Sequence, residues 1–296
     1  MTSRGDIGQD VVVRFAPSPN GLLHLGHAYA ACVAHDYARE RGGKLLLRIE
    51  DIDIGRSKPE FIDAIFADLR WLGLDWDGDA VFQSQRLQSY ANAAKQLKKK
   101  GVLYPCFCTR SSMRAIQEEE GLEEGPDGPI YPGTCRGLDK GEVAERLKRE
   151  PHSWRLDVKK ATDLIGDIGW HDERHGDQIA DPAVLGDVVL IPKDTPVSYH
   201  LAVTLDDARD GITHVVRGED LFASTHIHRL LQALMDLSVP RYVHHPVLLD
   251  ETRVKLSKSL DSASLAVLRE AGTDGYMIAD KLRKNIFPVG ITLSKG

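Results

Sequence analysis

The chain has 296 residues, of which 42% are hydrophobic, and its formal net charge is −6. This length allows one large domain or two ordinary ones. The hydrophobic fraction excludes wholesale disorder, and the negative net charge argues against a protein that coats nucleic acids without specificity. No apolar run of about 18 residues and no N-terminal signal core is found, and four cysteines are too few for a disulfide scaffold. We therefore expect a reduced, cytoplasmic protein with no membrane partner, and we expect a monomer.

Strands and helices alternate at the beginning of the chain. Residues 11–16 (VVVRFA) and 44–50 (KLLLRIE) are short and apolar, which is typical of buried strands. A helix is predicted at 25–41, before two glycines, and an amphipathic helix at 59–72 begins with a proline. This order of elements predicts a parallel α/β sheet.

The pattern breaks between about 106 and 185, where a cysteine cluster, a Gly/Pro-rich loop and mixed short segments occur. It resumes with segments 186–192, 199–203 and 212–221 and with a helix near 223–236. We therefore predict a Rossmann-like α/β catalytic domain that is split by an inserted module. The predicted boundaries are a first half at 1–105, the inserted module at 106–185, a second half at 186–245, and a loop with short helices at 246–296.

Two histidines lie at the start of the first predicted helix, in GLLHLGH (21–27). Gly21 and Gly26 allow tight turns and a close approach of the backbone to a ligand. A helix that begins here would direct its free N–H groups and its positive end toward an anion. His24 and His27 could then hydrogen-bond phosphate oxygens as charge develops on them. Taken alone, such histidines are more often structural.

A second polar motif, KLSKS, occupies residues 255–259. Lys255 and Lys258 flank Ser257 and could neutralise the charge of a departing pyrophosphate. A surface loop is the simpler interpretation of this motif alone. Its occurrence together with HLGH is a much rarer coincidence.

The segments APSPNGLLHLGH and KLSKS resemble the two signature motifs of class I aminoacyl-tRNA synthetases, and RFAPSPNGLLHLGH, LRIEDID and RGEDL are most similar to the glutamyl branch. The resemblance covers most of residues 11–260. Leu25 and Leu256 replace the usual isoleucine and methionine, which are apolar exchanges that leave phosphate chemistry intact. The resemblance implies catalysis by His24, His27 and Lys258. It also implies ATP, with Mg²⁺ on the leaving group, bound by His24, Gly26, His27, Lys255, Ser257 and Lys258.

A glutamate site must offer arginine to carboxylates and an acid or hydroxyl to the ammonium group. Arg14, Glu50, Tyr199 and Arg217 lie at the ends of predicted strands, where open α/β sheets bind ligands, and Ser18 lies in the loop after the first strand. Each of them could equally serve as an ion pair or a cap. The resemblance implies that glutamate is contacted by Arg14, Phe15, Ala16, Pro17, Ser18, Glu50, Tyr199 and Arg217.

Three cysteines, Cys106, Cys108 and Cys135, form a C-x-C pair and a third member across the Gly/Pro-rich loop. In a reduced protein this pattern suggests one structural zinc ion, although three ordinary cysteines are the alternative. The spacing leaves the fourth ligand open between Tyr131, His152 and water. The resemblance supports Tyr131, because small glutamyl-synthetase-like enzymes carry C-x-C followed by Y-x₃-C. Cys32 is more simply a core residue.

Only 37 residues follow Ser259, so we expect no anticodon-binding domain. With the cysteine pattern, this length resembles the glutamyl-queuosine tRNA(Asp) synthetase subfamily. The resemblance implies that glutamate is activated with ATP in the absence of tRNA. It is then transferred to the cyclopentene-diol of queuosine at the wobble position of tRNA(Asp). The RNA partner would be the anticodon arm, for which the basic stretches 95–100 and 281–284 are candidate contacts.

Three alternatives differ from this hypothesis. A truncated glutamyl-tRNA synthetase would charge a tRNA 3′ end instead. An inactive tRNA-binding paralogue is disfavoured by the intact motifs and pocket residues, and a nucleotidyltransferase sharing only HxGH is disfavoured by LRIED and RGEDL. The sequence identifies no general base for the transfer step.

Overall fold

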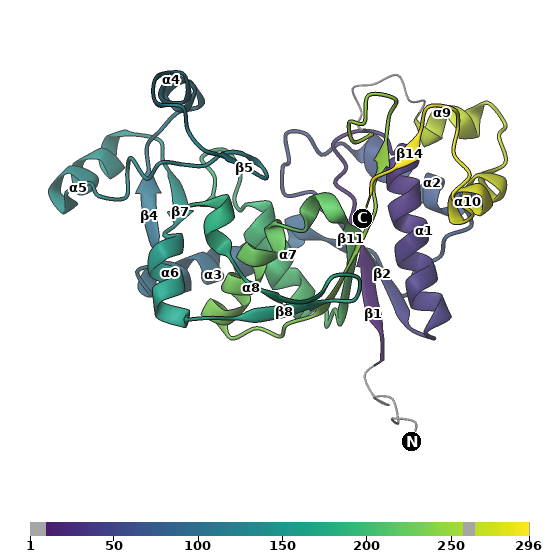
Figure 1. The fold of residues 1–296 in the computed structure, drawn as a ribbon, viewed down its shortest axis with the longest axis horizontal. Helices are drawn as coiled ribbons and strands as arrows, with labels where there is room; N and C mark the ends of the chain where they lie inside the picture. Colours follow the sequence, from purple (N-terminus) through teal and green to yellow (C-terminus); the bar gives the residue numbers. More distant parts are fainter. Residues whose placement is uncertain (1–9, 257–263, 296) are drawn as a thin grey trace.

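The computed structural model describes residues 10–256 and 264–295, and a parallel β-sheet in two parts forms its centre (Figure 1). The first part is parallel throughout and has the order β1 (Val12–Phe15), β2 (Lys44–Ile49), β3 (Val81–Phe82). The second part has the order β11 (His214–Gly218), β12 (Arg241–His245), β8 (Gly169–Asp172), β9 (Gly176–Ile179), and in it β9 alone is antiparallel to its neighbour. The two parts adjoin at β1, where the backbone N–H of Thr213 donates to the Val12 carbonyl at 2.9 Å.

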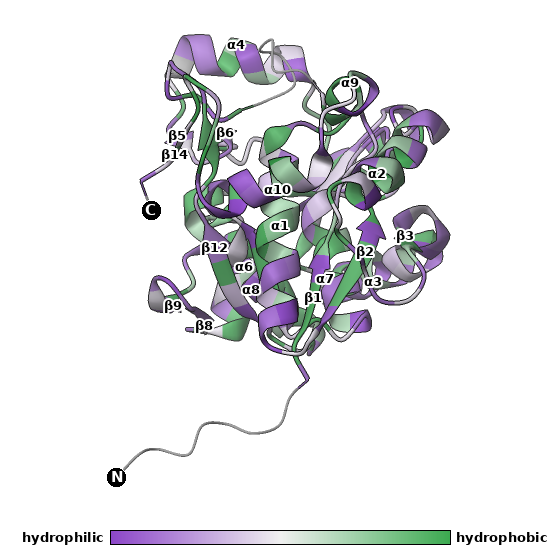
Figure 2. Ribbon diagram, turned by 90° about the vertical axis from the view of Figure 1, so that its right-hand side faces the viewer, coloured by the Kyte–Doolittle hydropathy of each residue, from purple (hydrophilic) through white to green (hydrophobic). Residues whose placement is uncertain are grey.

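Helices cover both faces of this sheet, which explains why β1 and β2 consist largely of apolar residues. Figure 1 shows α1 (Leu25–Glu40), α2 (Pro59–Trp71), α9 (Leu265–Glu270) and α10 (Gly275–Arg283) on one side. The opposite side carries α3 (Leu87–Lys99), α6 (Val158–Ile165), α7 (Tyr199–Arg209) and α8 (Ser224–Met235). Each side has its own hydrophobic core, and Figure 2 shows β1 and β2 as largely hydrophobic.

A smaller antiparallel sheet lies beside the second core, with the order β10 (Val189–Ile191), β7 (Ser153–Leu156), β4 (Leu103–Cys106). It carries two peripheral helices and a hairpin, namely α4 (Arg110–Glu120), α5 (Lys140–Arg149) and the hairpin of β5 (Glu124–Gly125) and β6 (Gly128–Pro129). A further two-stranded ladder joins β13 (Leu248–Leu249) to β14 (Thr292–Leu293). Short 3₁₀ helices cover Gln83–Arg86, Pro182–Leu185 and Glu219–Leu221.

The structure confirms the predicted α/β class with a parallel sheet, and the predicted strands at 11–16 and 44–50 are β1 and β2. The helices predicted at 25–41, 59–72 and 223–236 are confirmed to within about one residue at each end as α1, α2 and α8. No helix in the described part of the chain is long and apolar enough to span a membrane.

Three segments differ from the predicted alternation. Segment 199–203 is helical, because Tyr199 is the first residue of α7, so Tyr199 lies at the start of a helix and not at the end of a strand. Segment 186–192 does not return to the parallel sheet. Its strand β10 pairs antiparallel with β7, and Val189 lies opposite Arg155 in this pairing. Conversely, β8 lies within the segment 106–185 and pairs in parallel with β12, with Asp172 opposite Tyr242. The two sheets therefore interleave along the chain, and period-two patterns cannot show which sheet a short apolar strand joins.

Candidate active site

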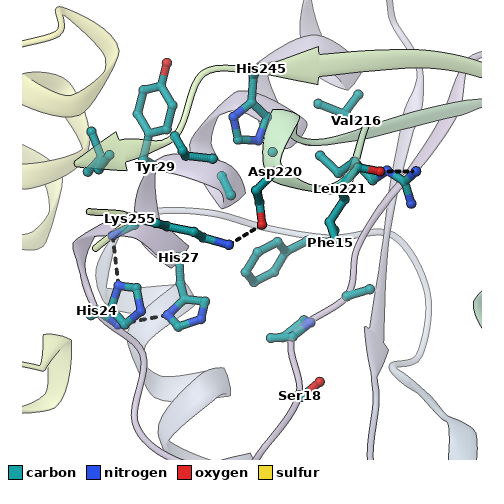
Figure 3. Close-up of a pocket in the computed structure, with 18 of the residues that line it drawn as sticks. Phe15, Ser18, His24, His27, Tyr29, Val216, Asp220, Leu221, His245 and Lys255 are labelled. Atoms are coloured by element: carbon teal, nitrogen blue, oxygen red, sulfur yellow. Dashed lines mark hydrogen bonds and ion pairs between the residues drawn. The ribbon is translucent and has the colours of Figure 1, made fainter. Parts of the chain in front are cut away.

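A cavity of about 750 Å³ lies at the carboxyl ends of β1, β2 and β11, between the starts of α1 and α7 (Figure 3). The predicted site residues that line it are Arg14, Phe15, Ala16, Pro17, Ser18, His24, Gly26, His27, Glu50, Tyr199, Arg217 and Lys255. Ser257 and Lys258 lie outside the described residues. Twelve predicted positions from five separate segments therefore share one cavity, although their roles are not shown by this placement alone.

The histidine pair is built into the start of α1. His24 is the N-cap, and its Nδ1 accepts the Gly26 backbone N–H at 3.1 Å. The His27 Nδ1 accepts the His24 backbone N–H at 3.2 Å, and the two ring centroids are 3.8 Å apart. Since both Nδ1 atoms accept, each neutral ring carries its proton on Nε2. A side chain at Gly26 would lie 3.0 Å from the His24 ring, so glycine permits this close packing.

Lys255 extends into the same cavity and forms an ion pair with Asp220 (Figure 3). An isolated antiparallel β-bridge to Leu249 of β13 holds the backbone of Lys255 at this position. Asp220 was not predicted as a site residue, although it belongs to the RGEDL segment that carries the resemblance. The ammonium group of Lys255 therefore lies in the cavity that also holds His24 and His27.

A buried acid on α7, Asp207, orients the side chain of Arg14, which lines the cavity. Its Oδ1 accepts Arg14 Nε at 3.0 Å and an Arg48 guanidinium nitrogen at 2.8 Å. Burial alone would raise the pKa of Asp207, but these two arginines lower it, so the carboxylate stays ionised. Neither Asp207 nor Arg48 was predicted; the only signal was a pair of acids in the apolar helix that begins at Tyr199.

Glu50, at the end of β2, has a different environment. Burial raises the pKa of its carboxyl to about 7, although Arg48 and Arg14 partly oppose this shift. The nearest ionic contact is Arg48, at 3.7 Å. Such a carboxyl group lines the cavity and is only partly ionised at neutral pH. A bound cation would lower its pKa and favour the ionised form.

Arg217, at the end of β11, is a buried cation surrounded by neutral acceptors. Its Nε donates to His244 at 3.1 Å, and one terminal nitrogen donates to the Tyr199 hydroxyl at 3.3 Å and to His228 Nδ1 at 3.2 Å. The other terminal nitrogen donates to the Leu221 carbonyl and the Thr225 hydroxyl. Among the described residues, none of these partners is a carboxylate. The cavity therefore presents a positive charge that suits an anionic ligand.

The protonation of the histidines around Arg217 follows from its chemistry, because a guanidinium can only donate. The His244 Nε2 accepts from Arg217, so its Nδ1–H donates to the buried Asp172 at 2.7 Å. Burial lowers the pKa of His244 to about 4, which keeps the ring neutral. Asp172 thus holds Arg217 in place through His244. Sequence reasoning missed both residues, because nothing in the sequence showed that β8 joins the parallel sheet.

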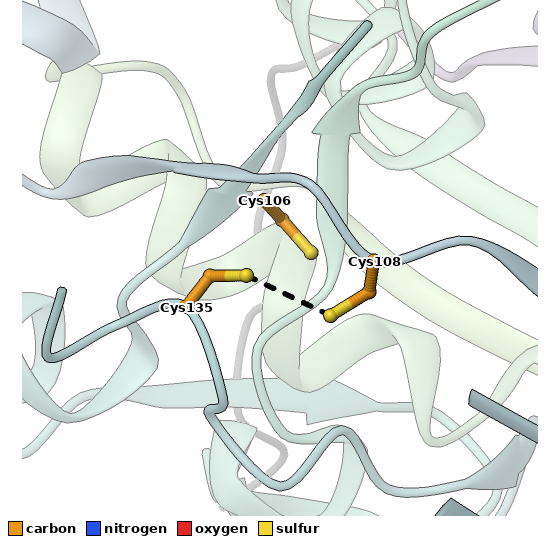
Figure 4. A group of neighbouring side chains, drawn as sticks. All are labelled: Cys106, Cys108 and Cys135. Atoms are coloured by element: carbon orange, nitrogen blue, oxygen red, sulfur yellow. Dashed lines mark hydrogen bonds between the residues drawn. The ribbon is translucent and has the colours of Figure 1, made fainter. Parts of the chain in front are cut away.

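The three cysteines predicted to bind zinc converge at the edge of the antiparallel sheet (Figure 4). Their sulfur atoms lie within 4.8 Å of one another, with Cys108 and Cys135 at 3.6 Å. Thiolates of one tetrahedral zinc site, with Zn–S of about 2.3 Å, would lie about 3.8 Å apart. Burial alone would raise the pKa of Cys106, but hydrogen bonds from Tyr131 and Arg155 outweigh burial and lower this pKa to about 7, whereas burial raises the pKa of Cys108 to about 11. The donor set therefore fits a zinc ion.

The position of the fourth ligand distinguishes the candidates left open by the spacing. The Tyr131 hydroxyl lies 3.4 Å from the Cys106 sulfur and 3.5 Å from the Cys108 sulfur. His152 instead places its Nδ1 3.2 Å from the Glu150 carbonyl and packs beside Phe107. This arrangement favours Tyr131 over His152.

The two basic stretches are partly occupied by intramolecular contacts. In 95–100, Lys98 lies over the Trp154 ring at 3.5 Å. In 281–284, Arg283 pairs with Asp36 and Lys284 pairs with Asp280. Contact of these stretches with RNA stays a prediction.

Comparison with known proteins adds three findings. Residues 10–289 match the family model described as tRNA synthetases class I (E and Q), catalytic domain. The chain is 43% identical to a Glutamyl-Q tRNA(Asp) synthetase of Rhodobacter capsulatus over 88% of this chain and 96% of the relative, and 42% identical to one of Symbiobacterium thermophilum over 91% and 84%. A crystal structure of glutamate-tRNA synthetase from Elizabethkingia anophelis superimposes with a TM-score of 0.78 at 28% identity. This superposition covers 94% of this chain and 62% of that one.

Proposed function

Because the chain belongs to the class I glutamyl and glutaminyl tRNA synthetase family, we propose that it activates L-glutamate with ATP and transfers it to queuosine at the wobble position of tRNA(Asp). The observation that carries this proposal is the identity of 42–43%, over most of the chain, to proteins named Glutamyl-Q tRNA(Asp) synthetase. The cavity supports it, because its positive and negative groups suit an amino acid with two carboxylates. The alternative, charging of a tRNA 3′ end, has less support.

In the first step, an oxygen of the glutamate α-carboxylate attacks the α-phosphorus of ATP, and the bond to pyrophosphate breaks. This gives glutamyl-adenylate and pyrophosphate. The Nε2–H groups of His24 and His27 would donate to the phosphate oxygens as their charge grows, with Gly26 allowing close approach. Lys255, Ser257 and Lys258 would complete the ATP site, and Mg²⁺ would supply charge neutralisation to the pyrophosphate. Most of the catalysis is positioning.

The glutamate is held by groups at the three strand ends. Arg217, assisted by Tyr199, would bind the side-chain carboxylate, and Glu50 would bind the α-ammonium group. Arg14 and the segment Phe15, Ala16, Pro17 and Ser18 would form the remaining wall. In the second step, a diol hydroxyl of queuosine attacks the activated carbonyl and AMP leaves.

Activation is expected to proceed without RNA, because all the groups assigned to it come from this chain. Glutamate-dependent exchange of labelled pyrophosphate into ATP should therefore be robust when tRNA is absent. Aspartate and glutamine serve as controls and should support little exchange, since neither places a carboxylate at the distance of Arg217. Exchange that starts only when tRNA is added would contradict this assignment.

The KM for glutamate is expected to depend on pH through Glu50. The folded-state pKa of Glu50 is raised to about 7, so the carboxylate that pairs with the ammonium group forms as the pH rises through that value. The KM should fall about tenfold between pH 6 and pH 8, in proportion to the ionised fraction. Steady-state exchange kinetics across this range measure the effect. In Glu50→Gln the KM should be high and nearly independent of pH.

We propose that the region 246–296 follows the catalytic domain as a loop with short helices. We also propose that the module within 106–185 holds one structural zinc ion, with Cys106, Cys108, Tyr131 and Cys135 as its ligands. The zinc ion would tie the strand β4 to the loop that follows the β5–β6 hairpin. Elemental analysis of protein purified without chelator should find one zinc per chain, and chelation should lower the Tm. Cys108→Ser should lose the metal, whereas the control Cys32→Ser should retain it, since Cys32 is buried away from the cluster. Wild-type protein without zinc would refute this site.

A further inference from the structure

A second cavity, of about 590 Å³, lies beside the first and has no role in the activation step. Its volume is in the range of small-molecule sites, about 300–1,000 Å³. Its walls come from α4, the β5–β6 hairpin, the antiparallel sheet and the start of α7. The two cavities are neighbours, because Tyr199 lines the first and His200, the next residue of α7, lines the second.

A chain of hydrogen bonds connects the two cavities. Arg217 donates to His228 Nδ1, so the neutral His228 carries its proton on Nε2, which lies 3.2 Å from His200 Nδ1. Burial lowers the pKa of His228, and it lowers the pKa of His200 to about 4, so both rings are neutral. His200 then accepts at Nδ1 and keeps its proton on Nε2. The second cavity thus has an N–H donor whose orientation is fixed by the glutamate-binding arginine.

The opposite wall offers acceptors. The Oε1 atom of Gln117 is buried and has no hydrogen-bond partner among the described residues, while its Nε2 faces the Glu124 carboxylate at 3.3 Å. Asp127, in the turn of the β5–β6 hairpin, also lines the cavity. Burial and the nearby charge of Asp220 raise the pKa of the Asp127 carboxyl. Asp220 is paired with Lys255, whereas Asp127 forms no ion pair with any residue that the structure describes.

The remaining lining suits a flat ring. Apolar side chains form much of the wall, namely Met113, Leu185, Val188 and Val189. The exposed Arg114 lies at the rim, where it could meet a phosphate. A ring with N–H donors, joined to a cationic group, would therefore satisfy both Gln117 and Asp127. Queuosine has this chemistry, since its 7-deazaguanine ring carries N–H donors and its diol is attached through a secondary ammonium.

We propose, on the basis of the proposed function, that the second cavity binds the acceptor nucleoside. Gln117 Oε1 accepts an N–H of the 7-deazaguanine ring, and Asp127 pairs with the ammonium of the linker. The diol then extends past the first turn of α7 toward the activated glutamate in the first cavity. Asp127 thereby distinguishes the modified base from guanine, which has no ammonium group.

The test is binding of tRNA(Asp) anticodon stem-loops that carry 7-aminomethyl-7-deazaguanine or 7-ethyl-7-deazaguanine at the wobble position. The two bases have similar shapes but differ in charge, and neither has a diol that can react. The wild-type protein should prefer the aminomethyl loop about tenfold, the size of one charge-assisted hydrogen bond. Fluorescence anisotropy of labelled loops gives both Kd values.

Asp127→Asn should reduce this preference to less than twofold, and the control Glu118→Gln, exposed on α4 outside the cavity, should keep it. Gln117→Leu should weaken both loops alike, because Gln117 contacts the shared ring. Circular dichroism checks that each variant folds. Full preference in Asp127→Asn, or none in the wild type, overturns the subsite. Absence of glutamate transfer to queuosine-containing tRNA(Asp) by the wild type would instead overturn the proposed function, whichever loop is preferred.

Discussion

Arg217→Ala is expected to raise the KM for glutamate by about 30- to 5,000-fold, since removing one partner of a buried charged pair costs about 2–5 kcal/mol. Arg217 is buried at the end of β11, and its acceptors in the described structure are all neutral. The side-chain carboxylate of glutamate would supply the missing negative charge. Pyrophosphate exchange as a function of glutamate concentration measures the change.

Two further variants separate binding from folding. Arg217→Lys keeps the charge but loses the planar fork, so its KM should lie between those of the wild type and Arg217→Ala. Arg241→Ala removes a half-exposed arginine of the neighbouring strand β12 and should leave the KM unchanged. The KM for ATP should stay within about threefold of wild type in all three. A wild-type KM for glutamate in Arg217→Ala would show that another group binds the side chain.

His24→Asn is expected to lower the kcat of activation by about 10²–10³-fold, which is the usual effect of losing one donor to a transition-state oxyanion. Asparagine is chosen because His24 is the N-cap of α1, and asparagine is a favourable N-cap. The exchange therefore removes the Nε2–H donor while the helix start is retained. Single-turnover formation of glutamyl-adenylate at saturating ATP and glutamate gives the rate.

The control for this variant is His171→Asn, which changes an exposed histidine of β8 that pairs with Asp177. Its rate and its Tm should equal those of the wild type. The Tm of His24→Asn should also remain close to wild type, because the cap is preserved. A rate within threefold of wild type would mean that His24 has only the capping role.

The sequence was sufficient to predict the parts of the cavity that lie in local motifs. HLGH predicted both the histidine pair and the start of α1, because capping and glycine packing depend on neighbours a few residues away. Arg14, Glu50 and Arg217 could be predicted because parallel strands end at the same edge of a sheet. Their meeting in one cavity required only the order of the strands.

The residues that orient these groups could not be predicted. Asp172 acts on Arg217 through His244, and it does so only because β8 leaves its sequence neighbours and pairs with β12. Asp207 lies on the helix α7, and its carboxylate contacts Arg14 of β1 and Arg48 of β2. Both contacts join segments more than 70 residues apart, and short apolar strands do not encode which sheet they enter.

The location of the transferred glutamate tests the central claim most directly. The protein is incubated with ATP, labelled glutamate and tRNA(Asp) that carries or lacks queuosine, and the labelled nucleotide is identified after nuclease digestion. We expect label in the anticodon loop, on the wobble nucleotide, and only in the tRNA that carries queuosine. Label on the 3′-terminal adenosine, or equal labelling of both tRNA samples, would contradict the account.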